Sequence, residues 1–214
     1  MPYVRHSLLT IDAQQKDALV SKLAEILDTR KGRPGLRAGR VSISDQRPGL
    51  EKDGENRMCI MAVFEDKDSA EANTVNATSL REHLANFLIG DGSPLVREGE
   101  IIWSFDAAGV EGKAIMPGYM RHTAVDFDPT KYNAMMAYSN STIDTFNSVS
   151  GLRRIRVGLV SNNRMIVSAA YDSKALAEAA SGIIANVWEG FAEFLTGEPR
   201  LLAGDLVYAY TRGN

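Results

Sequence analysis

The spacing of apolar residues in the first half of the chain predicts strands and helices in alternation. Residues 13–30 carry apolar side chains at helical spacing and follow Asp12, a residue type that suits a helix N-cap. In residues 36–44 apolar and polar side chains alternate, which predicts a strand with two different faces. Residues 57–65 are apolar on both faces, which favours a central strand. Further segments are predicted as a first strand (3–12), a second helix (68–88) and a last strand (98–106). The order is that of a ferredoxin-like βαββαβ unit.

The second half of the chain repeats this pattern. Residues 3–45 align without a gap onto residues 119–161, and 12 of the 43 pairs are identical. Residues 57–90 align onto residues 164–197 with 12 of 34 identical, whereas unrelated segments of average composition share roughly 6%. We therefore predict two similar units of a common domain size. They are a ferredoxin-like repeat over 1–106, a linker over 107–118 and a second repeat over 119–214.

The two repeats differ most between their second and third strands. The first repeat has a long polar segment there, residues 45–57, for which the sequence leaves open an extended hairpin or a lid. The second repeat has Asn162 and Asn163, which suit a tight hairpin because asparagine tolerates positive φ.

Apolar residues on both faces of the predicted strands indicate that both faces of each sheet are buried. Met58 and Ile60 lie on one face of the third strand, and Cys59 and Met61 lie on the other. Helices can cover one face, and the other needs a second apolar surface. The fold class we predict is therefore α+β, with two tandem ferredoxin-like repeats whose sheets meet as one intramolecular α+β barrel.

Composition narrows the classes of function. The formal net charge is −3, so no global charge attracts nucleic acid or an anionic membrane. The single cysteine, Cys59, excludes an intramolecular disulfide and a multi-cysteine metal site, and its apolar neighbours predict a buried thiol. We see no signal peptide and no apolar run long enough to span a bilayer, so we expect a cytoplasmic protein without a nucleic-acid or membrane partner.

The chain resembles the dimeric α+β barrel superfamily, and within it the antibiotic biosynthesis monooxygenase-like group. The resemblance lies in the βαββαβ order, in the Pro-Gly-Leu-Arg turn of residues 34–37, and in the strand-to-helix junctions of residues 63–70 and 170–177. It covers nearly the whole chain twice and implies a barrel made by one chain. The superfamily includes cofactor-free oxygenases of aromatic compounds, heme-degrading enzymes and heme-dependent relatives.

The residues depart from the heme-degrading pattern, which has an asparagine on the first strand with a tryptophan and a histidine on the second helix. Here the first strand has His6, one second helix has His83 without a tryptophan, and the other has Trp188 without a histidine. A chlorite dismutase-like proximal histidine is not found either, because His122 lies on a strand. We therefore expect no cofactor.

His6 and His122 occupy equivalent positions and are our candidate catalytic residues. Imidazole titrates near neutral pH, so either could act as a general base on a bound aromatic or carbonyl compound. The alternative is structural, with each ring bonded to a neighbouring group of the sheet.

A second set of polar and aromatic residues supplies candidate ligand contacts. Arg40 and Arg156 are equivalent and could bind an anion, or could form ion pairs with acids such as Glu100 and Asp205. The aromatic pairs of the fourth strands are typical of a core, although they could also form a ligand platform. The ligand-binding candidates are Arg40, Asn73, Asn76, His83, Trp103, Arg156 and Trp188. Because the second helix of the first repeat is the more polar, we expect a site in that half.

Two functions stay open on these residues. The first is a cofactor-independent monooxygenase-like enzyme acting on a small aromatic or enolisable compound, with His6 or His122 abstracting a proton. The second is a non-catalytic small-molecule-binding or structural barrel. Heme binding or degradation is a third and weaker reading, and a homodimer is left open.

Overall fold

The computed structural model describes residues 1–44, 55–110 and 118–212, and at residues 55 and 75–78 it describes the backbone only. The segment 45–54, which contains most of the predicted long loop, therefore lies outside the described residues. Most of the predicted linker, residues 111–117, does so as well.

The first half contains the predicted elements in the predicted order. Asp12 caps the first helical segment, since its side chain accepts a hydrogen bond from the backbone N–H of Gln14. Asp66 caps the second in the same way through Ser69. The elements are β1 (Tyr3–Asp12), η1 (Ala13–Gln15), α1 (Lys16–Asp28), β2 (Leu36–Ser44), β3 (Glu55–Phe64), α2 (Lys67–Ala72), α3 (Thr74–Leu84), η2 (Ala85–Phe87) and β4 (Leu95–Asp106).

The second half repeats these elements and their caps. Asp128 and Ser173 occupy the two capping positions. The elements are β5 (Gly118–Asp126), η3 (Pro129–Lys131), α4 (Tyr132–Ser141), α5 (Ile143–Ser148), β6 (Leu152–Ser161), β7 (Arg164–Tyr171), α6 (Lys174–Ala179), α7 (Ser181–Phe191), η4 (Ala192–Phe194) and β8 (Arg200–Thr211).

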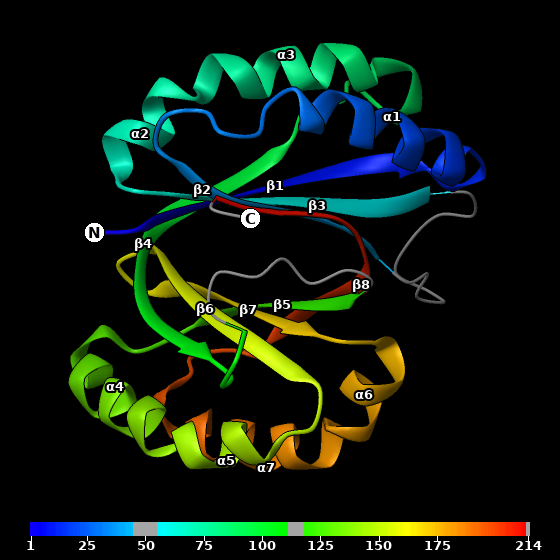
Figure 1. The fold of residues 1–214 in the computed structure, drawn as a ribbon. Coiled ribbons are helices and arrows are strands. Elements are labelled where there is room, and N and C mark those ends of the chain that lie inside the picture. Colours follow the sequence, from blue (N-terminus) through cyan, green and yellow to red (C-terminus); the bar gives the residue numbers. More distant parts are fainter. Residues whose placement is uncertain (45–54, 111–117, 213–214) are drawn as a thin grey trace.

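The described strands close into one antiparallel barrel in the order β1-β3-β2-β8-β5-β7-β6-β4. The predicted barrel is therefore confirmed. Helices α1–α3 cover the outside of one half and α4–α7 cover the outside of the other (Figure 1). In the described part of the chain, no helix is both long enough and apolar enough to cross a membrane.

The halves are joined because each lends its last strand to the other sheet. The beginning of β4 pairs with β1, and its end, from Glu100 to Asp106, pairs with β6. Likewise β8 pairs first with β5 and then with β2. In Figure 1, β4 runs from the first half into the second, and β8 runs back.

Gly99 and Gly204 make these two crossings possible. A Cβ atom at Gly99 would overlap with the carbonyl oxygen of Leu159, and one at Gly204 would overlap with that of Ile43. Only glycine permits such a close approach of two backbones.

The buried side chains form separate cores on the two faces of the sheets. Leu9 and Ile11 pack under the helices of the first half, and Val125 and Phe127 do so in the second. Val4, Met61 and their neighbours pack inside the barrel. Cys59 is buried, as predicted, and burial raises the pKa of its thiol to about 12.

Two details differ from the sequence prediction. The predicted second helix of the first half is two helices, which meet at Asn73, whose side chain donates to the carbonyl oxygens of Ser69 and Pro34. The tight hairpin between β6 and β7 is present, but neither Asn162 nor Asn163 has positive φ. The β6–β7 register shifts beside it, between Leu159 and Ser161. The expectation that this turn uses the left-handed tolerance of asparagine was therefore wrong.

Candidate functional site

Each half has a cavity between its helices and the outer face of the barrel. The cavity of the first half has a volume of about 140 Å³ and that of the second half about 270 Å³. The larger cavity therefore lies in the half that the sequence indicated less.

The second-half cavity is lined mainly by apolar and aromatic side chains. Trp103 comes from strand β4, and Phe146 of α5 packs against its ring. Trp188 and Phe191 come from α7. Hydroxyl groups of threonine and serine interrupt this lining, at Thr123, Ser139, Thr142 and Ser181. An apolar hollow with a few polar groups is the usual form of a small-molecule site.

Arg121 is the only charged residue among the described residues that line this cavity. Its Nη2 atom donates to Ser181 Oγ at 3.1 Å, and its guanidinium lies 5.6 Å from the ring centroid of Tyr171. Its Nε atom is buried and has no hydrogen-bond partner among the described residues. A donor in that state can donate a hydrogen bond to an oxygen atom of a ligand at low cost, because it has no protein partner to lose.

The counterpart of Arg121 in the first half has a carboxylate partner that Arg121 lacks. Its counterpart Arg5 lies opposite Glu98 in the β1–β4 pairing and forms an ion pair with it at 2.5 Å. In the β5–β8 pairing, Arg121 lies opposite Ala203. One substitution between the halves thus removes the carboxylate partner and leaves the positive charge of Arg121 at the cavity.

Tyr171 contributes a neutral hydroxyl group beside Arg121. Burial raises the pKa of Tyr171, although the nearby Arg121 opposes this shift. The tyrosine therefore stays protonated at neutral pH and can donate a hydrogen bond rather than accept a proton.

The first-half cavity is smaller and has more charge around it. Arg5, Asn73, Tyr208 and Tyr210 line it, and Leu80 and Leu84 close it from α3. Arg5 is engaged by Glu98 and by the hydroxyl of Thr74. The charge of Arg5, the counterpart of Arg121, is thus neutralised within the protein. Other cationic residues also line this cavity, namely Arg30, Lys31, Arg33, Arg40 and Arg81.

His6 and His122 lie inside the barrel and not in either cavity. Their ring centroids are 5.6 Å apart, and Ser168 Oγ joins them at 2.9 Å from His6 Nε2 and 2.9 Å from His122 Nδ1. Ser42 Oγ lies 3.2 Å from His122 Nε2. Both rings are buried, and neither is among the described residues that line the cavities.

Burial strongly lowers the pKa of both histidines. The pKa of His6 falls to about 3, through burial and then through the neighbouring His122, and the pKa of His122 falls to about 4 through burial. Both rings are therefore neutral at pH 7. Their role as general bases stays a prediction, and a substrate in either cavity would lie on the other side of the sheet from them.

Comparisons with known proteins agree with this architecture. No known family model matches the sequence, and no curated protein matches it. A candidate monooxygenase from Fusobacterium nucleatum superposes with a TM-score of 0.76 at 11% identity, over 100% of this chain and 95% of that one. A candidate monooxygenase from Lactobacillus acidophilus gives a TM-score of 0.73 at 13% identity, over 99% and 97%. An anthrone oxidase-like protein gives a TM-score of 0.68 at 14% identity, over 100% and 94%.

The chain has the α+β barrel fold of these three structures. The match extends over 94–97% of their length, so the likeness in fold concerns nearly the whole of each molecule. At such low identity the likeness concerns the fold, and function has to be argued from the site.

Heme does not fit the described lining of either cavity of the barrel. Among the described residues, neither cavity has a histidine that could serve as an axial ligand, since His6 and His122 lie inside the barrel. The third histidine, His83, is exposed on α3, and its Nδ1 lies 2.6 Å from the carbonyl oxygen of Ser79. No group of three metal-binding side chains occurs in the described part of the chain.

The structure of the barrel separates the other predicted ligand contacts. Trp103 and Trp188 line the second-half cavity, and Asn73 lines that of the first half. His83 lines neither, and the side chain of Asn76 lies outside the described residues. The predicted set from α3 therefore does not come together around one ligand.

Of the two arginines for which ion pairs were expected, Arg156 forms one and Arg40 forms none with a described residue. Arg156 pairs with Asp106 at 2.7 Å, and Arg40 donates to the carbonyl oxygens of Gly39 and Tyr210 and to Thr211 Oγ1. Asp205 instead lies 3.5 Å from Lys16. Glu100 and Asp205 are not the partners because they lie where β4 and β8 cross between the sheets, whereas the arginines lie opposite the ends of those strands.

Sequence reasoning missed Arg121 as a site residue. The matched pair Arg5 and Arg121 was visible in the repeat, but the functional signal is the loss of the acid opposite one of them. Aligning β4 with β8 through Glu100 and Asp205 places Glu98 against Ala203. Only the strand pairing shows that these positions face the arginines.

Proposed function

We propose that the second-half cavity binds a small aromatic compound that carries one acidic oxygen, and that the protein is a cofactor-independent monooxygenase-like enzyme for such a compound. The observation that carries the proposal is Arg121, a cation with no carboxylate opposite it, in an otherwise uncharged cavity. A phenolate, enolate or carboxylate oxygen would complete its hydrogen bonds.

The aromatic part of the ligand follows from the rest of the lining. Trp103, Phe146, Trp188 and Phe191 line the hollow. Aromatic pairs gain attraction beyond area burial in offset and edge-to-face arrangements. The volume of about 270 Å³ admits two or three fused rings.

Arg121 can also assist the chemistry of an enolisable compound. A guanidinium beside the carbonyl oxygen stabilises the enolate and thereby lowers the pKa of the C–H bond next to the carbonyl. The enolate carbon then donates electrons to O₂, one oxygen atom forms a C=O bond, and the other leaves as water with the two hydrogens of the carbon. The overall step consumes one O₂ and needs no added reductant, because the substrate is the electron donor.

A non-catalytic small-molecule-binding protein is the second candidate, and one observation favours it. The described lining of the second-half cavity contains no histidine or carboxylate that could take up the substrate proton. The enzyme then depends on the acidity of the bound compound and on water as the proton acceptor. In either case the site is complete within one chain, and a homodimer is not required for it.

Ligand binding can be tested with 2-naphthoate and its neutral analogue 2-naphthamide. The chain has two tryptophans, and both line this cavity, so intrinsic fluorescence reports on it directly. We expect 2-naphthoate to quench this fluorescence and to bind more tightly than the amide in calorimetry. Equal affinities, or no binding of either compound, would contradict a site for an acidic aromatic ligand.

Two variants test the part played by Arg121. R121M should weaken 2-naphthoate binding about 10- to 100-fold, since a buried hydrogen bond to a charged group is worth about 1.5–3 kcal/mol. A203E should weaken it as well, because it adds the carboxylate that Glu98 provides to Arg5 in the other half. Y210F, which changes the first-half cavity, should leave the affinity unchanged.

Catalysis is tested with anthrone, an enolisable tricyclic ketone, in an oxygen electrode. The enzyme proposal expects uptake of one O₂ for each anthrone converted to anthraquinone, with a slower rate in R121M. Tight binding of anthrone without oxygen uptake above the rate of free anthrone would favour the binding protein. Unchanged turnover when His6 and His122 are both replaced would remove the histidines from the mechanism.

A further inference from the structure

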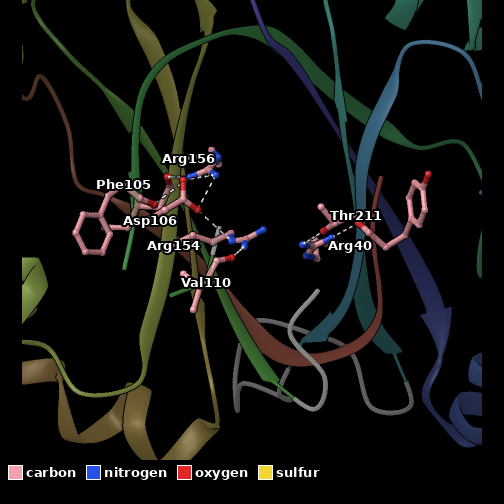
Figure 2. Close-up of polar contacts among 9 residues, drawn as sticks. Arg40, Phe105, Asp106, Val110, Arg154, Arg156 and Thr211 are labelled. Carbon is pink, nitrogen blue, oxygen red and sulfur yellow. Dashed lines mark hydrogen bonds and ion pairs between the residues drawn. The ribbon is translucent and has the colours of Figure 1, made fainter. Parts of the chain in front are cut away.

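Two arginine side chains, Arg40 and Arg154, point toward one another between the β2–β8 and β4–β6 walls of the barrel, and a third, Arg156, lies beside Asp106 (Figure 2). Arg40 comes from β2, and Arg154 and Arg156 come from β6. Arg156 and Gly158 have the same parity on β6, and a Cβ at Gly158 would overlap with Val4 inside the barrel. Arg154 and Arg156 therefore lie on the inner face of the sheet, and neither lines a ligand cavity, whereas Arg40 also borders the first-half cavity.

Arg154 and Arg156 share one carboxylate. Asp106 lies opposite Arg154 in the β4–β6 pairing, 3.3 Å from its Nε, and 2.7 Å from Arg156 Nη2. Arg154 Nη2 donates to the carbonyl oxygen of Val110, and Arg156 Nη1 to that of Phe105. Asp106 is thus bonded to both guanidinium groups of its own wall.

Arg40, on the opposite wall, has only neutral partners among the described residues. They are the carbonyl oxygens of Gly39 and Tyr210 and the hydroxyl of Thr211. The arginine is 6% exposed, so water does little to compensate its charge. Burial and then the positive charges of Arg154 and Arg156 lower the pKa of Arg40 to about 10.

The repeat explains why this charge is uneven. In the strand pairing Asp106 faces Arg154, and at the equivalent place Thr211 faces Ala38. The β4–β6 wall therefore carries two arginines and one aspartate, and the β2–β8 wall carries one arginine and no acid at these positions.

We propose that Arg40, Arg154 and Arg156 form a binding site for a tetrahedral dianion of the phosphate class. Arg40 has no carboxylate among its described partners, and guanidinium groups bind phosphate oxygens in their fork geometry. The side chains of Arg156 and Asp106 are 21% and 28% exposed, so the site is reached from solvent on the side of that pair. The proposal is independent of the aromatic ligand of the second-half cavity.

The first test is thermal unfolding in a chloride buffer of low ionic strength, with inorganic phosphate added at constant ionic strength. Binding to the folded state raises the melting temperature, here by roughly 5 °C at saturating phosphate. A melting temperature that follows ionic strength alone would overturn the proposal.

A matched pair of variants at Thr211 separates a bound anion from a merely structural arginine. T211D introduces beside Arg40 the carboxylate that Asp106 provides on the other wall. It should raise the melting temperature in phosphate-free buffer and abolish the response to phosphate. T211N is neutral and should keep the response. A response of equal size in T211D and wild type would contradict the site.

R40M gives an independent reading. If repulsion from the neighbouring arginines makes Arg40 destabilising until an anion binds, R40M should melt at or above the wild-type temperature without phosphate and should lose the phosphate response. If Arg40 served only to bond Tyr210 and Thr211, R40M would melt lower under both conditions, and the response would persist. That result would overturn the proposal.

A further titration distinguishes free phosphate from the phosphoryl group of a larger ligand. A glycerol phosphate that binds at least as well as inorganic phosphate would indicate the phosphoryl group of a larger ligand, and weaker binding would indicate the free ion.

Glu111 follows Val110 in the sequence and lies outside the described residues. A phosphate response that appears only in E111Q and not in wild type would show that the chain provides its own carboxylate, and would contradict the proposal.

Discussion

At the residue scale, the two halves are most different where equivalent positions carry different charges. Arg5 faces Glu98, whereas Arg121 faces Ala203. His6 and His122 are the opposite case, because they are identical and meet at one serine, Ser168. The position equivalent to Ser168 in the first half is Met61. Duplication retained the rings, while the hydroxyl that joins them is present only once.

The buried histidines predict a pH-dependent stability. Their folded pKa values, about 3 and about 4, lie below the unfolded value of about 6.5, so the unfolded state binds more protons between these limits. The free energy of unfolding should be constant above pH 7. It should fall by about 1.4 kcal/mol per pH unit for each histidine as the pH decreases from 6.5 toward 4.

Urea denaturation at several pH values measures this slope. H6N should reduce it by about half, and H83Q should leave it unchanged because His83 is exposed on α3. The same slope in H6N and wild type between pH 6.5 and 4.5 would show that other groups are responsible.

At the scale of the elements, the exchanged strands β4 and β8 determine the shape of the molecule. Each pairs with a strand of its own half and then with a strand of the other. The crossing requires two backbones to approach more closely than a Cβ atom would allow, at Gly99 and at Gly204.

Alanine at Gly204 should therefore be strongly destabilising. The added Cβ would overlap with backbone atoms of Ile43, which cannot rotate away, and we expect a loss of at least about 3 kcal/mol or failure to fold. G182A, in α7, is the control. Its Cβ would meet nothing within 4 Å, so it should be neutral or stabilising by up to about 1 kcal/mol. A G204A protein as stable as G182A in urea denaturation would contradict this account of the crossing.

At the scale of the whole molecule, the barrel should unfold as one unit although it consists of two repeats. Neither sheet is complete without a strand from the other half. The interior is also shared, because Val4 and Met61 of the first half pack with Met120 and Leu206 of the second.

Core substitutions in the two halves should therefore shift the same transition. L23A and M135A each remove a side chain that is 1% exposed, one under α1 and one in α4. Each should lower the free energy of unfolding by about 2–5 kcal/mol. A single calorimetric transition, with matching tryptophan fluorescence, is expected for both. Two transitions, with only one of them moved by each variant, would show that the halves fold independently.

The sequence alone determined the elements, their order and the closure of the two sheets into a barrel. These follow from the local spacing of apolar residues and from apolar residues on both strand faces. Both patterns are visible within single segments of the sequence. Trp103 and Trp188 were predicted as ligand contacts and both line the second-half cavity, while their contact with a ligand stays a prediction. Arg156 forms the expected kind of ion pair, but with Asp106, and Arg40 forms none with a described residue, because strand register, and not matching position in the repeat, decides which acid lies opposite an arginine.

Only the tertiary structure decided what each polar residue shared by the two repeats faces. Sequence cannot show that His6 and His122 turn inward to one serine while Arg121 turns outward to a cavity, because a strand alternates its faces without revealing which one is inside. It also cannot show that Arg121 lies opposite Ala203, or that Arg40 lies near Arg154, since strand register and the closure of the barrel decide these neighbours. Arg121 and Arg40 have no carboxylate partner among the described residues as a result of that arrangement, and their charges are the basis of the two proposed binding sites.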